Sequence, residues 1–432
     1  MKERKENVAS STQEARPFQG ARIWLVGILL LHVALSLVYW GRTPYGIPPD
    51  EGPHGKYVQH LVETGHLPVF SSADRADYEY HQPPLYYRLG APFFRLGKAL
   101  KFSDPASMVR LFSLILGAIA IVLTYLAVAK LFSGRADGQR LAVMSSGFVG
   151  LLPMHLMLSS SVSNDMLTEV IFSLTLLVCT AILMDGMTWL RTMVIGCVLG
   201  VGLLTKTTCI ILFPVVLVAY LLAGRAKKIA WTSVGGHVAT ALAISLVIGG
   251  WWLMRNIRLY GDLLAISQFN KTFQDTAKPD MLIVAFGPLW YLERLVGWTF
   301  ASFWGVFGHM DTFMPAWAYL IFGVASLSAL VRGIPAVRDL MSKAGTVRDV
   351  LVIFTLTVGL VGIAFLKFNA SFFQVQGRYL YPAILPISVL WSMGISGLFP
   401  KKYENLAIYM GIGIPILAQI IALTTCFPIG AT

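Results

Sequence analysis

The sequence predicts an all-α polytopic membrane protein, and three observations support this fold class. Of its 432 residues, 56% are hydrophobic and only 13% are charged, and the mean hydropathy is +0.67. In soluble domains about a quarter of the residues are charged, so a soluble fold is excluded. A helix needs roughly 20 residues to cross the hydrocarbon. Runs of 19 or more residues without Asp, Glu, Lys or Arg occur at Ile23–Gly41, Leu111–Ala129, Leu141–Asn164, Ala230–Met254 and Tyr379–Pro400.

About eleven transmembrane helices are expected from the hydropathy pattern. Residues 1–21 are polar and are predicted to form a disordered cytoplasmic tail. The first apolar run is span-length and lacks a small-residue cleavage site, so no cleavable signal is predicted. Residues 22–432 are expected to form a single transmembrane domain without a separate soluble domain. The predicted spans are residues 22–41, 106–130, 141–161, 166–184, 190–205, 208–224, 234–254, 314–331, 350–366, 379–399 and 406–426.

The placement of Lys and Arg predicts the orientation of the chain. With the N-terminus inside, the short inner segments carry 18 of the 34 Lys and Arg residues. Because positive residues favour cytoplasmic loops, we expect a multi-pass protein of the plasma (bacterial inner) membrane with a cytoplasmic N-terminus. Loops 42–110 and 255–313 would then form an active-site face in the periplasm or outside the cell. Residues 282–310 are aromatic but interrupted by Glu293-Arg294, and are expected to be interfacial or re-entrant.

The 42–110 loop contains two predicted helices. The first, at about 53–64, begins at Gly52-Pro53-His54, and proline suits a first helical turn. The second, at about 84–100, follows His81-Gln82-Pro83-Pro84. It carries an apolar stripe with Tyr86 and basic residues beside it, so it is expected to lie in the membrane interface. The stripe has residues three or four apart: Leu85, Leu89, Phe93, Leu96 and Leu100.

Two carboxylate motifs have both a structural and a functional interpretation. Asp50 and Glu51 directly follow the first span, a position that suggests chemistry on a substrate that is part lipid. Asp165 follows Ser163-Asn164, and Glu169 lies one turn further on the same helical face. The alternative for both motifs is helix capping, because Asp favours helix N-termini.

Isolated cations lie on the same predicted face. Lys206 is the one charged residue between Arg191 and Arg225, and it either binds an anion or snorkels to the membrane surface. Three arginines lie beside span ends, where they either anchor to lipid headgroups or bind a phosphate, for which arginine is the preferred bidentate ligand. They are Arg255, Arg258 and Arg378.

Other classes of function have little support. The net charge of +12 could indicate a nucleic-acid partner, but the positive-inside bias accounts for most of it and no compact basic domain is present, so none is expected. The cysteines lie in apolar helices without metal-binding spacing, and no disulfide is predicted. They are Cys179, Cys197, Cys209 and Cys426.

Taken in order along the chain, these motifs resemble the GT-C glycosyltransferases. Within that superfamily the chain is most similar to bacterial members related to protein O-mannosyltransferases and to the aminoarabinose transferase of lipid A. The likeness covers nearly the whole chain from residue 22. It is carried by Pro49-Asp50-Glu51, Gln82-Pro83-Pro84-Leu85-Tyr86-Tyr87, Val162-Ser163-Asn164-Asp165, Leu203-Leu204-Thr205-Lys206, Trp251-Trp252-Leu253-Met254-Arg255-Asn256 and Gln376-Gly377-Arg378-Tyr379-Leu380-Tyr381-Pro382.

The resemblance implies a fold with two juxtamembrane helices in the first outer loop and a polyprenyl-phosphate sugar as donor. It implies that Asp50 is an essential acid, that Asp165 is a second acidic position, and that Lys206 and Arg255 face the phosphate. Two departures matter. Aminoarabinose transferases have Glu-Lys-Pro-Pro where this chain has His81-Gln82-Pro83-Pro84, so a phosphate-binding lysine is missing. A C-terminal soluble domain like that of some relatives is not expected, which leaves the acceptor open.

We therefore predict a membrane glycosyltransferase of the cell envelope that moves a sugar from a polyprenyl phosphate to a hydroxyl of a glycan, lipid or protein. Asp50 would be the general base, with Glu51 assisting and Asp165 as a third catalytic residue, and transfer would invert the anomeric carbon. A divalent metal, Mg or Mn, between Asp50 and Asp165 is left open, and no other cofactor is expected. The candidate substrate-binding residues are His54, His81, Gln82, Tyr86, Lys206, Arg255, Arg258, Arg378 and Tyr379.

Two other functions remain as alternatives. A transporter or flippase of a lipid-linked or anionic substrate would place broken helices and charges near the bilayer midplane, often in repeated halves. Here the informative charges lie at span ends, and no internal repeat is apparent. A non-catalytic subunit of an envelope complex would leave the carboxylates unexplained.

Overall fold

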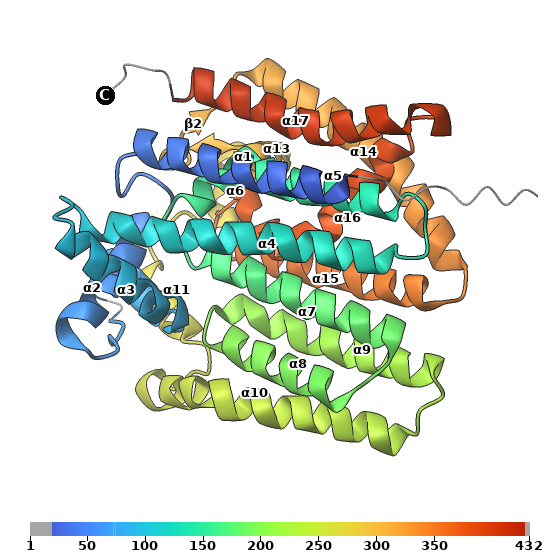
Figure 1. Cartoon of the computed structure of the whole chain (residues 1–432). Helices are drawn as coiled ribbons and strands as arrows, with labels where there is room; N and C mark the ends of the chain where they lie inside the picture. Colours follow the sequence, from blue (N-terminus) through green and yellow to red (C-terminus); the bar gives the residue numbers. More distant parts are fainter. Residues whose placement is uncertain (1–19, 72, 74, 428–432) are drawn as a thin grey trace, which may run out of the picture.

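The protein is a bundle of long helices with shorter helices gathered at one end (Figure 1). The structure, a computed structural model, describes residues 20–71, 73 and 75–427. The all-α fold class predicted from the sequence is confirmed. Most of the predicted N-terminal tail, residues 1–19, lies outside the described residues.

Within the described part of the chain, nine helices are long and apolar enough to cross a membrane. Five of them are single α-helices: α1 (Ala21–Arg42), α7 (Asp165–Asp185), α10 (Trp231–Tyr260), α14 (Ala316–Ser342) and α15 (Thr346–Asn369). The other four begin with a 3-10 helix: η2 (Pro105–Val109) with α4 (Arg110–Leu131), η3 (Thr207–Ile211) with α9 (Leu212–Ala226), η4 (Gly377–Ala383) with α16 (Ile384–Ser396), and η5 (Lys401–Tyr403) with α17 (Glu404–Thr425).

Two further predicted spans are present in modified form. The span expected at 141–161 is a pair of helices, α5 (Gly138–Leu151) and α6 (Pro153–Ser159), bent by 64° at Leu152. Pro153 causes the break, because it lacks a backbone donor and forces the residue before it into an extended conformation. The span expected at 190–205 is the shorter apolar helix α8 (Trp189–Leu203). Each of the eleven predicted spans thus corresponds to a helical segment.

The short elements of the predicted outer loops lie at one end of the bundle, where Figure 1 shows α2, α3 and α11 together. The two juxtamembrane helices predicted in the first loop are confirmed as α2 (Glu51–Thr64) and α3 (Leu85–Ala99). The remaining elements are η1 (Arg75–His81), α11 (Ile266–Thr272), α12 (Pro279–Phe286), α13 (Pro288–Trp304), and an antiparallel hairpin of β1 (Val306–Phe307) and β2 (Thr312–Phe313).

Helix α3 is amphipathic in the predicted register. Leu89, Leu96 and Leu100 on the apolar stripe are exposed, as expected for a helix in the membrane interface. The opposite face, including Tyr86 and Tyr87, is fully buried. The first residue of α3 is fixed because the Leu85 backbone N–H donates to the Leu204 carbonyl at 2.9 Å. This bond joins α3 to the segment that carries Lys206.

Helix α13 packs against η4 at the same end of the bundle. The Gly377 backbone N–H donates to Ser302 Oγ at 2.7 Å, and the Tyr381 hydroxyl donates to the Phe303 carbonyl at 2.8 Å. Within the described residues, α12 and α13 are not among the helices that are long and apolar enough to span. Segment 282–310 thereby positions η4, the element that carries Arg378.

Helices α8 and α10 touch closely and fix the start of the Lys206 segment. A Cβ on Gly249 of α10 would lie 2.6 Å from the Gly200 carbonyl of α8, so only glycine fits there. Small residues at such crossings let membrane helices approach closely. The close contact holds the last turn of α8, from which the chain continues into residues 204–206.

Candidate active site

Asp50 occupies an unusual backbone position at the entrance of α2. Its φ is 63° and its ψ is 4°, a left-handed conformation that is rare for residues other than glycine and often found at functional sites. The side chain makes no capping hydrogen bond to α2, so capping does not account for this residue. Instead the Tyr78 hydroxyl donates to Asp50 Oδ1, and Arg378 pairs with Oδ2. The Asp50 side chain is 30% exposed, so a substrate can reach its carboxylate.

A row of alternating charges continues from Asp50 into the bundle. Arg378, whose side chain is only 2% exposed, also contacts Asp165, with 3.3 Å between Nη1 and Oδ2. Lys206 Nζ pairs with the other oxygen of Asp165. At the start of α7, Asn164 makes no side-chain cap, and the Asp165 carboxylate faces the two cations. The order is therefore Asp50, Arg378, Asp165, Lys206, from four segments distant in sequence.

The charges around Asp50 set its ionisation. Burial opposes the charged form, but the Arg378 guanidinium outweighs it and holds the pKa of the Asp50 carboxyl well below its usual range. Burial and the Asp50 charge raise the pKa of Tyr78 well above its usual range, so Tyr78 stays protonated and donates. Asp50 is consequently an ionised acceptor at neutral pH.

Glu51 faces away from this row and forms a buried ion pair with Arg110. The distances are 2.7 Å from Arg110 Nε to Oε1 and 2.6 Å from Nη2 to Oε2. Oε1 also accepts from the Val162 backbone N–H at 3.0 Å, and Oε2 accepts from Gly46 at 2.8 Å. Each carboxylate oxygen thus has two donors, and the side chain is fully buried. Glu51 thus connects the segments that contain Gly46, Arg110 and Val162, and both of its carboxylate oxygens are occupied by these contacts.

Arg110 completes this arrangement from the first residue of α4. Besides pairing with Glu51, it donates to the carbonyls of Trp40, Thr43 and Pro44, at 3.2, 2.8 and 3.2 Å. These bonds hold the chain between α1 and α2, which carries Asp50 at its end. Arg110 was not among the candidate residues predicted from the sequence. The available signal was its position at the very edge of an apolar span.

His54 and Glu79 form a second buried pair beside Asp50. His54 Nδ1 lies 2.8 Å from the Tyr87 hydroxyl and 3.6 Å from Glu79 Oε2. Burial, with the nearby negative charge of Asp50, raises the pKa of Glu79 to about 8. Burial lowers the pKa of His54 to about 3. At neutral pH the pair is therefore a largely protonated carboxyl next to a neutral imidazole.

Glu79 was missed by the sequence analysis. It is buried, and among the described residues its Oε2 has no hydrogen-bond partner. The available signal was weak, namely an acidic residue between Tyr78 and Tyr80, two residues before His81. Its position near Asp50 depends on η1 folding back over α2, which no local pattern predicts.

Tyr86 and Gln82 have structural contacts. The Tyr86 hydroxyl lies 2.7 Å from Ser113 Oγ and accepts from the Ser163 backbone N–H at 3.0 Å. The carbonyl of Gln82 accepts from the Tyr57 hydroxyl at 3.3 Å, and its buried side-chain Oε1 lacks a partner within the described chain. Tyr86 therefore supports the loop before Asp165 from a fully buried position.

His81 and Tyr379 lie on an aromatic surface next to the charged row. His81 Nδ1 is 2.5 Å from the Tyr78 carbonyl, and its ring centroid is 5.1 Å from that of Phe269 in α11. The Tyr379 ring lies 5.1 Å from the Arg378 guanidinium. Tyr78 itself meets Phe273 edge-on at 5.5 Å. This surface is suited to an apolar or sugar-like group beside Asp50.

Arg255 and Arg258 do not pair with the carboxylates of the charged row within the described residues. Arg255 Nη2 donates to the Pro68 carbonyl at 2.6 Å, and its guanidinium lies 4.8 Å from the Trp252 ring. Arg258 is exposed near the end of α10. Of the four predicted phosphate-binding cations, Lys206 and Arg378 share a carboxylate, whereas Arg255 holds the 65–70 loop and Arg258 faces outward.

The arrangement does not fit a divalent metal between Asp50 and Asp165. The guanidinium of Arg378 already bridges these two carboxylates, and Lys206 lies on the far side of Asp165. A divalent cation there would be repelled by both side chains. In the described residues no group of three or more His, Cys, Asp or Glu has the geometry to hold a metal.

Comparisons with known proteins show similarity over part of the sequence and in the fold. A family model for the dolichyl-phosphate-mannose-protein mannosyltransferases matches residues 81–252, which include Asp165 and Lys206. Among curated proteins no sequence match was found. Among solved structures, the apo state of ArnT from Cupriavidus metallidurans is 17% identical, with a TM-score of 0.52 over 92% of this chain.

The oligosaccharyltransferase of Archaeoglobus fulgidus is also similar. Its structure tethered to an acceptor peptide is 15% identical, with a TM-score of 0.55 over 95% of this chain. The structure of AglB from the same organism, with an inhibitory peptide and a dolichol-phosphate, has a TM-score of 0.51. This chain spans 64% of ArnT and 54% to 55% of the archaeal enzyme. The chain therefore has an ArnT-like GT-C fold, which confirms the resemblance predicted from its sequence.

Proposed function

We propose that this chain, with its ArnT-like GT-C fold, is a membrane glycosyltransferase that moves a sugar from a polyprenyl phosphate to an acceptor hydroxyl. One observation carries the proposal most strongly. A reachable, ionised Asp50 lies in a row with Arg378, Asp165 and Lys206 at one end of a membrane-spanning bundle. In this row Asp50 can accept a proton, and Lys206 and Arg378 can bind a phosphate. The row lies where both a lipid substrate and a water-soluble substrate can reach it.

The lipid-phosphate donor is supported by the cations. The cations of the row are Lys206, which is partly buried, and Arg378, which is buried, and charge-assisted bonds from such groups hold phosphate well. Asp165 keeps the two cations close together before the donor arrives. One of the similar structures, AglB, holds a dolichol-phosphate. We propose that the donor phosphate takes over part of the pairing that Asp165 provides in this structure.

The chemistry would be a single displacement. The acceptor oxygen forms a bond to the anomeric carbon while the bond from that carbon to the phosphate oxygen breaks. The acceptor proton goes to Asp50, and the phosphate leaves with its charge stabilised by Lys206 and Arg378. One base and no covalent intermediate predict inversion at the anomeric carbon. When Arg378 shifts towards the phosphate, Asp50 becomes a stronger base, because the guanidinium that depresses its pKa has moved.

The other residues have supporting roles in this proposal. Glu51 and Arg110 position the turn that holds Asp50, Tyr78 orients the carboxylate, and His54 with Glu79 forms the wall beside it. Arg255 supports the 65–70 loop. Because Arg378 occupies the space between the carboxylates, we propose that transfer needs no divalent metal, so a chelator should leave the rate unchanged.

The test of the proposed function is Asp50→Asn, assayed with a polyprenyl-monophosphate sugar and the protein in lipid. Asparagine keeps the shape but accepts no proton at neutral pH, so transfer should fall by about 10² to 10⁴ with donor binding retained. Asp77→Asn, an acidic residue of η1 whose carboxylate pairs with exposed Lys56, is the matched control and should stay near wild-type activity. Near-normal turnover in Asp50→Asn would remove Asp50 from the role of base.

A lipid transporter is the second candidate, and one observation favours it. The break between α5 and α6 brings a buried pair, His155 and Glu169 at 3.1 Å, into the bundle below the site. Broken helices with buried charges are typical of transporters. A transporter moves the intact lipid-linked substrate, so the sugar–phosphate bond would survive in the assay above.

A further inference from the structure

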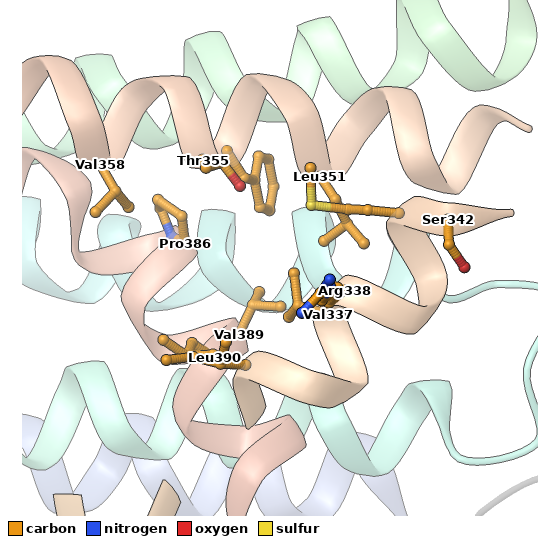
Figure 2. Close-up of a pocket in the computed structure, with 12 residues that line it drawn as sticks. Val337, Arg338, Ser342, Leu351, Thr355, Val358, Pro386, Val389 and Leu390 are labelled. Carbon is orange, nitrogen blue, oxygen red and sulfur yellow. The ribbon is translucent and has the colours of Figure 1, made fainter. Parts of the chain in front are cut away.

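A second cavity lies away from the candidate active site, between α14, α15 and α16 (Figure 2). Its volume is about 530 Å³, within the range of small-ligand pockets. Val358 and Pro386 line one end and Ser342 lines the other, with Arg338 between them beside Val337 (Figure 2). Nine of its twelve lining residues are apolar, and Arg338 is the one charged residue among them. The cavity is therefore mainly apolar, with one cation on its lining.

The cavity exists because α14 crosses α16 and then leads to α15. At the crossing, a Cβ on Gly333 would lie 2.7 Å from the Leu390 carbonyl, so the two helices touch there. Pro335, two residues later, removes a helix hydrogen bond, and α14 continues to Ser342 next to the start of α15. The cavity lies at this level, lined by residues of all three helices. Figure 1 places this part of α14 and α15 at the end of the bundle opposite α2 and α3.

The cavity is somewhat shorter than one lipid leaflet. From Ile334 to Ser342 a helix rises about 12 Å, and half of the hydrocarbon core of a bilayer is about 15 Å. Ile334 and Val358 on its lining are 54% and 39% exposed, so the cavity opens on the flank of the bundle. In a membrane that flank faces acyl chains.

Among the described residues Arg338, the cation on the cavity lining, is unpaired, whereas two nearby cations are paired. Lys343 pairs with Asp339 at 2.6 Å, and Arg348 pairs with Asp349 at 2.8 Å. By contrast, the exposed Arg338 side chain has no hydrogen bond or ion pair to any residue that the structure describes. An apolar cavity with an unpaired guanidinium on its lining matches an acyl chain attached to an anionic headgroup.

We propose that this cavity binds one acyl chain of an anionic phospholipid from the leaflet opposite the candidate active site, with its phosphate on Arg338. The polyprenyl chain of a donor would enter from the other end, where Lys206 and Arg378 lie, so the two lipid sites are separate. The inference does not depend on the proposed function.

The test is native mass spectrometry of the full-length protein released from nanodiscs that contain phosphatidylglycerol and phosphatidylcholine with the same acyl chains. Wild-type protein should retain phosphatidylglycerol preferentially. Arg338→Gln should weaken that retention roughly tenfold or more, because it removes a charge-assisted bond. Lys343→Gln is the matched control, since it removes an equal charge from a residue already paired with Asp339, and retention should stay near wild type. Equal losses in both variants would overturn the proposal and indicate general surface charge.

The chain subsite has its own readouts. Val389→Trp should fill the cavity and lower retention of both phospholipids. Wild-type protein should hold short-chain phosphatidylglycerol at least several-fold more weakly than the long-chain lipid. This comparison requires no substitution. Equal retention of short-chain and long-chain phosphatidylglycerol would overturn the proposal. So would retention of a polyprenyl lipid in place of the phospholipid, or a dimer that retains no phospholipid.

Discussion

Asp50 and Glu51 are adjacent carboxylates that have different partners. The left-handed backbone at Asp50 turns its side chain towards Tyr78 and Arg378, while Glu51 turns into the bundle towards Arg110. One carboxylate remains reachable and the other is saturated with donors. Because a saturated, buried carboxylate holds structure and a reachable one can exchange protons, the two residues should respond differently to loss of charge.

Glu51→Gln should destabilise the fold more than Asp50→Asn does. Removing one member of a buried ion pair leaves an uncompensated charge, which typically costs about 3–5 kcal/mol. Arg110 would be left in that state, because its other partners are carbonyls. Thermal unfolding of both variants in the same detergent measures the difference. A Glu51→Gln melting temperature equal to that of wild type would mean that the ion pair contributes little to the fold.

Glu79 should make stability fall as pH rises. Its ordinary pKa is 4.5, and burial raises the pKa to about 8 in the folded protein. Between those values the unfolded chain loses the Glu79 proton and the folded protein keeps it, so the folded state loses relative stability from pH 4.5 up to about pH 8. The difference in melting temperature between Glu79→Gln and wild type should therefore grow in favour of the variant over this window. A difference that is constant with pH would contradict the buried, protonated carboxyl.

At the scale of elements, the charged row joins η3, η4 and the start of α7. Lys206 and Arg378 meet on the two oxygens of Asp165, although they are far apart in sequence. In the proposed function they would also share one phosphate, so their effects on donor binding should be coupled. Arg258, exposed near the end of α10, provides a comparison with a cation at the same end of the bundle.

A double-mutant cycle with Lys206→Gln and Arg378→Gln should show this coupling. Each lost charge-assisted bond should cost roughly 1.5–3 kcal/mol of binding to a polyprenyl monophosphate. The two effects should not add, because the groups share a partner. Arg258→Gln should change affinity little. Independent effects below about 0.5 kcal/mol would rule out a shared phosphate.

Helices were predictable from the sequence because their signals are local. The apolar stripe gave the register of α3, Gly52-Pro53 indicated the start of α2, and uncharged runs gave the spans. Asp50, Asp165, Lys206 and Arg378 were predicted as candidates because carboxylates and cations that can bind phosphate recur on one predicted face of the membrane. Their pairing was not predictable, and nor were the separate positions of Arg255 and Glu51. Those depend on how η1, η4 and the α5–α6 break fold against each other in three dimensions.

For the whole molecule, the candidate active site lies at the end of the bundle with α2 and α3, and the parts of α14 and α15 that line the proposed lipid cavity lie towards the opposite end (Figure 1). From the distribution of positive charge we predict that the end opposite the site is the cytoplasmic one. An outward-facing site would meet acceptors outside the cell, so the orientation decides which acceptors are accessible.

Cysteine labelling in intact cells should measure this orientation. Lys271→Cys, at the site end, should react with a membrane-impermeant thiol reagent, whereas Arg135→Cys and Lys343→Cys should react only after permeabilisation. Wild-type protein is the control for its own cysteines, of which Cys197 is exposed on the flank of the bundle. The reverse pattern would place the active site in the cytoplasm. Labelling of Lys343→Cys together with Lys271→Cys, but not of Arg135→Cys, would mean that residues 282–310 cross the membrane. Helix α14 would then run in the opposite direction, which the contact between α13 and η4 at the site end argues against.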